Sequence, residues 1–160
     1  MTKAVAGARL IIVCGLPGSG KTTYAKQLEA KLDAIRLCAD EWMGPLGIDL
    51  WDEPSRGRIE ALQWQFGQKL LALGLTVVVE WGTWGKSERD ALRLRARELG
   101  AVVELHYLSA TVDDLFDRVQ RRGLERPPIR REQLVQWAGA LQIPTAEEQA
   151  LFDRAVTVAV

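Results

Sequence analysis

Five short runs of aliphatic and β-branched residues predict the strands of this chain. They lie at residues 9–14, 34–39, 75–79, 101–108 and 155–160. Nearly continuous apolar runs are typical of strands that are buried on both faces. Helical patterns separate these runs at residues 21–32, 56–74, 86–99, 111–123 and 130–140, and a short helix follows Thr145. The alternation predicts an α/β fold with a parallel sheet between two layers of helices.

Two of the predicted helices carry local signals that can be checked residue by residue. The helix at residues 56–74 has apolar residues at steps of three and four, namely Ile59, Leu62, Phe66, Leu70 and Leu73. We expect this stripe to face the sheet. The short helix near the end of the chain begins with a capping box formed by Thr145 and Glu148.

Length and composition indicate one ordered domain that covers residues 1–160. The chain has 160 residues, of which 48% are hydrophobic and 26% are charged, and these fractions are average for ordered globular proteins. The length suits one domain and is too short for two comfortable ones.

Charge and cysteine content restrict the partners and the location. Lys and Arg number 21, as do Asp and Glu, so the net charge is zero, which disfavours a protein that wraps long nucleic acid. No apolar run reaches the ~18 residues of a membrane-spanning helix. The N-terminal apolar stretch is short and leads into glycines, so we expect no signal peptide. The two cysteines, Cys14 and Cys38, lie in apolar runs, which favours a reducing cytoplasmic location.

A phosphate-binding motif of the form G-x-x-x-x-G-K-T runs from Gly15 to Thr22, after a predicted strand and before a predicted helix. Its glycines allow close approach of a ligand, and its backbone N–H groups form a cradle for phosphate at a helix N-terminus. Lys21 is expected to reach the β- and γ-phosphates of ATP, and the Thr22 hydroxyl to ligate Mg²⁺. The predicted nucleotide-binding residues are Gly15, Pro17, Gly18, Ser19, Gly20, Lys21, Thr22 and Thr23.

Carboxylates follow the second and third predicted strands. Asp40 is placed to accept a proton from an attacking hydroxyl, although a role near Mg²⁺ or as a helix cap is also open. Glu41 is its nearest competitor for the role of base. Glu80 ends the third strand and can serve Mg²⁺, the acceptor or a structural ion pair.

Six arginines lie between residues 118 and 131, against one acid, Glu125. Arg118 and Arg122 are four residues apart and share a helix face. Guanidinium groups suit the charge that develops on a transferring phosphoryl group. We expect Arg118 and Arg122 to be functional, and Arg121, Arg130 and Arg131 to lie on a solvated face.

The motifs, taken in order, resemble those of small P-loop kinases that include the 5′-hydroxyl polynucleotide kinases, the zeta toxins and chloramphenicol phosphotransferase. The matching segments are GLPGSGKTT, CADEW, VVVEWGT, DLFDRVQRRG and QIPTAEE. The resemblance implies a five-stranded parallel sheet in the order 2-3-1-4-5 and Asp40 as the general base. It also implies that Arg118 and Arg122 are lid arginines, with a mobile lid at about residues 123–144.

Two departures from the polynucleotide kinase pattern bear on the acceptor. Those enzymes carry an arginine three residues after the base aspartate, where this chain has Met43. They also have an Asp-Thr-Asn run after the third strand, where this chain has Glu80-Trp-Gly-Thr-Trp84. Both changes replace polar recognition groups with apolar or aromatic ones.

Six tryptophans are a high number for 160 residues. Four of them, Trp42, Trp51, Trp81 and Trp84, follow the second and third strands, where the acceptor is expected. Aromatic walls there suit a ring-bearing small molecule. Trp64 and Trp137 lie in predicted helices and are expected in the core.

The sequence therefore predicts an ATP- and Mg²⁺-dependent kinase for a hydroxyl of a ring-bearing small molecule, such as a sugar, aminocyclitol, nucleoside or antibiotic. Asp40, Lys21, Arg118 and Arg122 would be catalytic, while Asp40, Glu80 and the four tryptophans would face the acceptor. Two alternatives stay open: a kinase for the 5′-hydroxyl of RNA or other polynucleotides, and an ATP-binding switch with slow hydrolysis.

Overall fold

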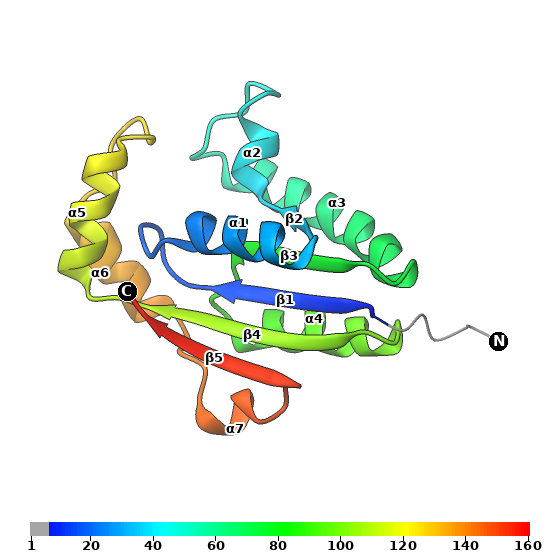
Figure 1. Cartoon of the computed structure of the whole chain (residues 1–160). Helices are drawn as coiled ribbons and strands as arrows, with labels where there is room; N and C mark the ends of the chain where they lie inside the picture. Colours follow the sequence, from blue (N-terminus) through cyan, green and yellow to red (C-terminus); the bar gives the residue numbers. More distant parts are fainter. Residues whose placement is uncertain (1–6) are drawn as a thin grey trace.

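A computed structural model describes residues 7–160 (Figure 1). Residues 1–6, which hold part of the N-terminal stretch considered above, lie outside the described residues. The strands are β1 (Arg9–Cys14), β2 (Ile35–Leu37), β3 (Thr76–Gly82), β4 (Val102–Ser109) and β5 (Arg154–Ala159). The helices are α1 (Lys21–Leu32), α2 (Ala39–Met43), α3 (Glu53–Ala72), α4 (Lys86–Glu98), α5 (Val112–Arg122), α6 (Arg131–Ala140) and α7 (Ala146–Gln149).

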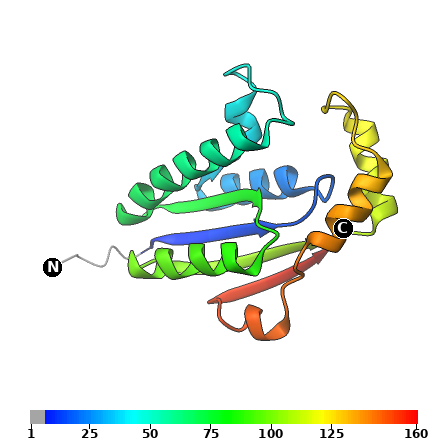
Figure 2. The same ribbon diagram turned by 180° about the vertical axis from the view of Figure 1, so that it is seen from behind.

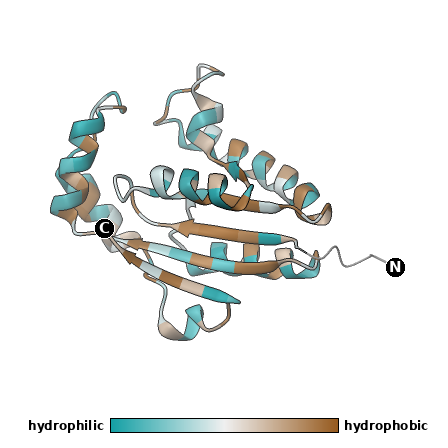
Figure 3. Cartoon of the chain, viewed as in Figure 1, coloured by the Kyte–Doolittle hydropathy of each residue, from teal (hydrophilic) through white to brown (hydrophobic). Residues whose placement is uncertain are grey.

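The strands form one sheet in the order β2-β3-β1-β4-β5, and every pairing is parallel. This confirms the predicted fold class and strand order. The most hydrophobic strand, β1, lies at the centre, where both of its faces are covered (Figure 3).

Helices cover the two faces of the sheet in separate layers. On one face, Ala25 of α1 packs with Ile11, Val13 and Val78. On the other face, α3 and α4 pack on the alternate residues of β1 and β3, and this layer is nearest the viewer in Figure 2. All strands run the same way, so their carboxyl ends meet at one edge, and the phosphate-binding loop leaves β1 there.

The second strand is shorter than predicted, because a helix begins where the strand was expected to end. Strand β2 stops at Leu37, and α2 starts at Ala39 with Asp40 and Glu41 in its first turn. Acidic side chains in a first turn complement the positive end of a helix, which accounts for the early start. The N-cap residue is Cys38, so Asp40 is not the helix cap.

The predicted apolar stripe of α3 is wrong at three positions. Leu62, Phe66 and Leu73 are 53%, 42% and 69% exposed. The buried positions of the helix are Ile59, Gln63, Gly67, Leu70 and Leu71.

Two local contacts explain why α3 is turned this way. The Gln63 side chain donates to the carbonyl of Cys38 and accepts a hydrogen bond from the Trp81 indole, so its burial leaves both ends paired. Gly67 allows close packing, since a Cβ there would lie 3.1 Å from Cδ1 of Leu37. The face of α3 that packs on the sheet thus contains Gln63 and Gly67, whereas the apolar pattern predicted Leu62 and Phe66 there.

The predicted capping box at α7 forms only in part. The Thr145 hydroxyl accepts a hydrogen bond from the backbone N–H of Glu148 at 3.2 Å. The Glu148 carboxylate does not reach back to the cap, because it forms a buried ion pair with Arg89. Within residues 7–160, no helix has the length and apolar character needed to cross a membrane.

Candidate active site

The phosphate-binding loop links β1 to α1 at the carboxyl edge of the sheet. Gly18 and Gly20 have φ values of 83° and 88°, a region that glycine enters without strain. A Cβ on Gly18 would also lie 2.8 Å from the carbonyl oxygen of Leu115 in α5. The loop therefore needs glycine at this position both for its turn and for its contact with the arginine-bearing helix.

Lys21 lies in a strongly charged environment at the start of α1. Burial lowers the pKa of Lys21 to about 8; the nearby Arg122 acts in the same direction, whereas Glu80 and Asp40 oppose the shift. Residues from α2, β3 and α5 are thus within electrostatic reach of this ammonium group. The charges of the predicted base, the predicted metal ligand and one predicted lid arginine therefore all affect the pKa of Lys21.

Thr22 and Glu80 meet directly. The Thr22 hydroxyl donates to Oε1 of Glu80 at 2.7 Å, and Oε2 of Glu80 accepts from Arg36 at 3.2 Å. Magnesium in phosphoryl-transfer sites is bound through one or two protein oxygens together with phosphate oxygens. The adjacent hydroxyl and carboxylate fit this requirement, so Thr22 and Glu80 are the residues that would hold the ion.

Asp40 is exposed at the start of α2 and is paired with an arginine that the sequence reading missed. Its Oδ1 accepts a hydrogen bond from Arg56 of α3 at 2.5 Å, and Arg56 also donates to the carbonyl of Leu50 at 2.9 Å. Met43, the position that bears arginine in polynucleotide kinases, is fully buried against Ile59. An arginine does therefore lie beside Asp40, but it comes from the next helix.

Arg118 and Arg122 differ in their contacts. Arg118 is half-buried, and its guanidinium donates to the carbonyl of Gly18 in the phosphate-binding loop at 3.4 Å. Arg122 is exposed and pairs with Glu125 at 2.5 Å. Arg131, expected on a solvated face, is exposed and pairs with Asp113 of α5.

A cavity of about 390 Å³ adjoins the phosphate-binding loop on the side of β4 and β5. Its lining residues are Ser19, Gly20, Thr23, Tyr24, Gln27, Leu108, Arg118 and Val160. The Tyr24 hydroxyl in this lining lies 2.7 Å from Nδ1 of His106, and Nε2 of His106 lies 2.8 Å from Glu104. The cavity has the position and size to hold the base of a nucleotide whose phosphates lie in the loop. Tyr24, Gln27, Leu108 and Val160 carry no local motif, and the sequence reading missed them.

The tryptophans separate into two groups. Trp137 of α6 lies between Trp51 and Trp84, with ring centroids 6.2 and 6.0 Å away. The Trp51 indole donates to the carbonyl of Pro127 at 3.0 Å, and the Trp84 indole donates to the carbonyl of Gly15 at 3.3 Å. This group connects the loop before α3, the predicted lid and the phosphate-binding loop.

The second group lies beside the helix that bears Asp40. Trp64 and Trp81 pack edge to face with centroids 6.4 Å apart. Trp42 and Trp81 are half-buried and pack against the core formed by Ala39, Met43 and Ile59. Trp64 and Trp137 thus have the packing roles expected of them. Trp42 belongs to the same helix as Asp40, and Trp81 packs against the same small core as this helix.

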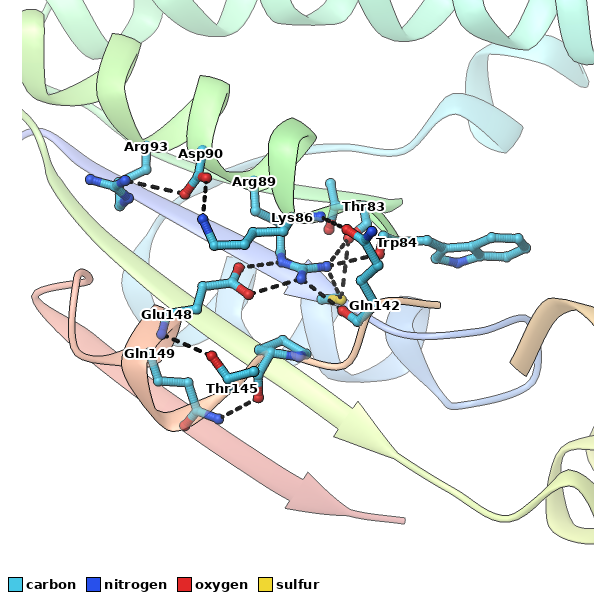
Figure 4. Close-up of polar contacts among 12 residues, drawn as sticks. Thr83, Trp84, Lys86, Arg89, Asp90, Arg93, Gln142, Thr145, Glu148 and Gln149 are labelled. Atoms are coloured by element: carbon cyan, nitrogen blue, oxygen red, sulfur yellow. Dashed lines mark hydrogen bonds and ion pairs between the residues drawn. The ribbon is translucent and has the colours of Figure 1, made fainter. Parts of the chain in front are cut away.

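A buried arginine, Arg89, connects α4 to the segments that follow β3 and α6 (Figure 4). The guanidinium of Arg89 forms two hydrogen bonds with the Glu148 carboxylate, at 2.6 and 3.0 Å. It also donates to the backbone carbonyls of Thr83, Trp84 and Gln142. The sequence predicted a helix at residues 86–99 but gave no sign that Arg89 is buried. Arg89 ties α4 to the end of the predicted lid.

The phosphate-binding loop follows the central strand of a parallel sheet in the order 2-3-1-4-5, and an arginine-bearing helix lies against the loop. These features define a P-loop kinase fold. The chain belongs to the AAA domain family, whose sequence model matches residues 10–144.

Solved structures with the same fold include two kinases and a protein in complex with ADP-AlF3. A gluconokinase from Sinorhizobium meliloti is 21% identical, with a TM-score of 0.61 over 99% of this chain and 85% of that one. Kti12 from Chaetomium thermophilum, in complex with ADP-AlF3, is 20% identical, with a TM-score of 0.71 over 94% and 88%. The APS kinase CysC from Mycobacterium tuberculosis, in complex with AMPPNP and APS, is 18% identical, with a TM-score of 0.63 over 94% and 88%. Comparison with curated proteins found no match. At these identities the likeness shows a shared fold.

Proposed function

We propose that this protein is an ATP- and Mg²⁺-dependent phosphotransferase that moves the γ-phosphate to a hydroxyl of a ring-bearing small molecule. The observation that carries the proposal is the exposed Asp40 carboxylate at the start of α2, which Arg56 holds at Oδ1. The phosphate-binding loop meets Glu80 through the Thr22 hydroxyl and Arg118 through the Gly18 carbonyl. A protein that only binds nucleotide has no need of a carboxylate such as Asp40 in addition to these groups. The same proposal treats residues 1–160 as one kinase domain with a lid at about residues 123–144.

Each charged group has a role that follows from its position. The loop N–H groups, Lys21, Arg118 and Arg122 neutralise the phosphates and the charge that develops during transfer. When bound at Thr22 and Glu80, Mg²⁺ supplies further positive charge to the phosphate oxygens. Asp40 accepts the proton of the attacking hydroxyl. Arg56 holds Asp40 at Oδ1, so Oδ2 is the oxygen that we assign to the proton.

The aromatic residues near Asp40 support a small acceptor. Trp42 and Trp81 offer half-buried apolar surface beside α2, which suits one face of a sugar or other ring. Gluconokinase and APS kinase, which share the fold, are named for small-molecule acceptors. We therefore favour a ring-bearing metabolite or antibiotic over a polymer.

A second candidate is a kinase for the 5′-hydroxyl of RNA or another polynucleotide, and Arg56 is the observation that favours it. Its guanidinium lies beside Asp40, where it could bind the phosphate that follows the terminal nucleoside. In the free protein this arginine is already engaged by Asp40 and by the carbonyl of Leu50. Binding a nucleic-acid phosphate there would require those contacts to be exchanged.

The experiment that tests the proposal measures acceptor-dependent ADP formation. The wild-type protein, with Mg²⁺ and ATP, is supplied with panels of sugars, aminocyclitols, nucleosides and antibiotics, and separately with 5′-hydroxyl oligonucleotides. We expect one small-molecule class to accelerate ADP formation and Asp40→Asn to abolish the acceleration, with ATP affinity nearly unchanged.

The matched control is Glu53→Gln, which removes another carboxylate that lies 3.8 Å from Arg56. It should retain activity. Efficient, salt-sensitive labelling of oligonucleotides would favour the second candidate. Slow ADP formation that no acceptor accelerates would contradict both and favour a nucleotide-dependent switch.

A further inference from the structure

Arg36 occupies a buried position between three carboxylates from three different elements. Its side chain is 5% exposed. The guanidinium contacts Glu29 of α1 at 3.1 Å, Glu41 of α2 at 2.6 Å and Glu80 of β3 at 3.2 Å. Burial lowers the pKa of Arg36, but hydrogen bonds to Glu41 and Glu29 and the charge of Glu80 outweigh this effect and raise the pKa overall.

The third of these carboxylates belongs to the site that would hold magnesium. Glu80 has one oxygen on the Thr22 hydroxyl and the other on Arg36. Its carboxylate therefore has two fixed contacts, and its orientation depends on both. If the arginine contact were lost, Glu80 could rotate away from Thr22.

We propose that Arg36 is a positioning residue for the magnesium site formed by Thr22 and Glu80. It fixes the Glu80 carboxylate against the Thr22 hydroxyl. Groups that hydrogen-bond to metal ligands set their orientation, and removing such a group commonly weakens metal binding by about 10–100-fold. This inference rests on the proposed function, since the ion acts there together with ATP.

The same guanidinium also reaches the acceptor side. Glu41 is the neighbour of Asp40 in the first turn of α2, so its bond to Arg36 links the helix that bears the base to the strand that bears Glu80. Only a side chain with several N–H donors in a fixed plane makes all three contacts at once. Lysine at this position would keep the charge and lose most of the bridging geometry.

The test measures nucleotide binding, not turnover. Isothermal titration gives the affinity of a non-hydrolysable ATP analogue with saturating Mg²⁺ and with EDTA, and the ratio is the gain due to magnesium. For Arg36→Lys we expect that gain to decrease about tenfold, with the affinity in EDTA little changed. Glu29→Gln, which removes one anchor of Arg36 far from the phosphates, should give a smaller decrease in the same direction.

The matched control is Arg89→Lys, the same exchange at the other buried arginine, which contacts neither Thr22 nor Glu80. It should lower the thermal unfolding temperature and leave the magnesium gain intact. The role of Arg36 would be overturned if Arg36→Lys and Glu29→Gln both kept the wild-type increase in analogue affinity on addition of magnesium. It would also be overturned if Arg89→Lys lost as much of this increase as Arg36→Lys. A wild-type protein whose analogue affinity does not respond to Mg²⁺ would instead overturn the proposed function.

Discussion

The buried pair of Arg89 and Glu148 makes the most quantitative prediction. Their side chains are 0% and 1% exposed, and they form two hydrogen bonds across 59 residues of sequence. Removing one member of such a pair leaves a buried charge without compensation and costs about 3–5 kcal/mol of stability. Arg89→Met is the appropriate perturbation because methionine fills a similar volume without charge or donors.

The expected loss is a large part of the total free energy of unfolding. Domains of ordinary size are stable by about 5–15 kcal/mol. In a domain of about 150–250 residues, each kcal/mol shifts the unfolding midpoint by about 2–4 °C, so Arg89→Met should unfold about 6–20 °C below the wild type. Circular dichroism during heating, together with urea unfolding at 25 °C, measures the change.

A double-mutant cycle separates the ion pair from the other contacts of Arg89. Arg89→Met with Glu148→Met removes the stranded carboxylate, so it should be more stable than Arg89→Met alone. It should remain below the wild type, because the carbonyls of Thr83 and Gln142 still lack their donor. The reasoning is refuted if Arg89→Met loses less than about 1 kcal/mol, the net value of one ordinary hydrogen bond, or if the double variant is the less stable one.

Three further predictions concern the phosphate-binding loop and the lid. Burial lowers the pKa of Lys21 to about 8, so the free protein loses this positive charge as the pH rises through that value. Titration calorimetry should therefore show weaker binding of an ATP analogue at pH 9 than at pH 7. Equal affinity at the two pH values would contradict this. Gly18→Ala should weaken the binding of the same analogue at least about tenfold and lower the free energy of unfolding by about 1–3 kcal/mol. The reason is that the new Cβ would lie 2.8 Å from the Leu115 carbonyl oxygen, at a residue whose φ is 83°. Binding and unfolding curves like those of the wild type would refute this prediction. Trp51→Phe keeps a ring but removes the hydrogen bond to the carbonyl of Pro127, which is worth about 1 kcal/mol. Limited proteolysis should therefore cut the predicted lid about fivefold faster. An unchanged rate would count against the contact.

Local patterns were sufficient for the sheet and the phosphate-binding loop. The apolar run at residues 9–14 and the glycines after it define a buried strand and its loop without reference to the rest of the chain. The strand order came from the resemblance carried by the motifs, and the structure has the same order. Arg118 donates to the Gly18 carbonyl of the loop, and its role as a lid arginine stays a prediction.

The buried arginines could not be predicted in the same way. Charged residues are almost always exposed unless they are paired, and the partners of Arg36 and Arg89 are distant in sequence. Glu80 follows Arg36 by 44 residues, and Glu148 follows Arg89 by 59. The one available signal for Arg36 was its position inside an apolar strand, which a surface residue would not occupy.

The tryptophans show a different limit of sequence reasoning. Trp42 and Trp51 follow β2 and Trp84 follows β3, as expected, but β3 continues to Gly82, so Glu80 and Trp81 lie inside this strand and not after it. A position along the chain also does not tell which neighbour a ring will face. Trp51 and Trp84 both lie beside Trp137, a residue assigned to the core, and their indoles donate to Pro127 and Gly15. Their role as acceptor residues stays a prediction, and the geometry gives them a second role in joining the lid to the loop.

The two buried arginines share a physical reason for their place at the carboxyl edge. Backbone carbonyls and carboxylates that leave the sheet there require donors, because burying them unpaired is costly. One guanidinium supplies up to five N–H groups in fixed directions, so a single Arg36 or Arg89 can hold several elements at once. Arg118 and Arg122 are less buried and have fewer contacts, which suits residues that move with a lid. Under the proposed function, Arg36 would keep Glu80 against Thr22 through its ion pairs, and Arg118 and Arg122 would be available to the phosphate that is transferred.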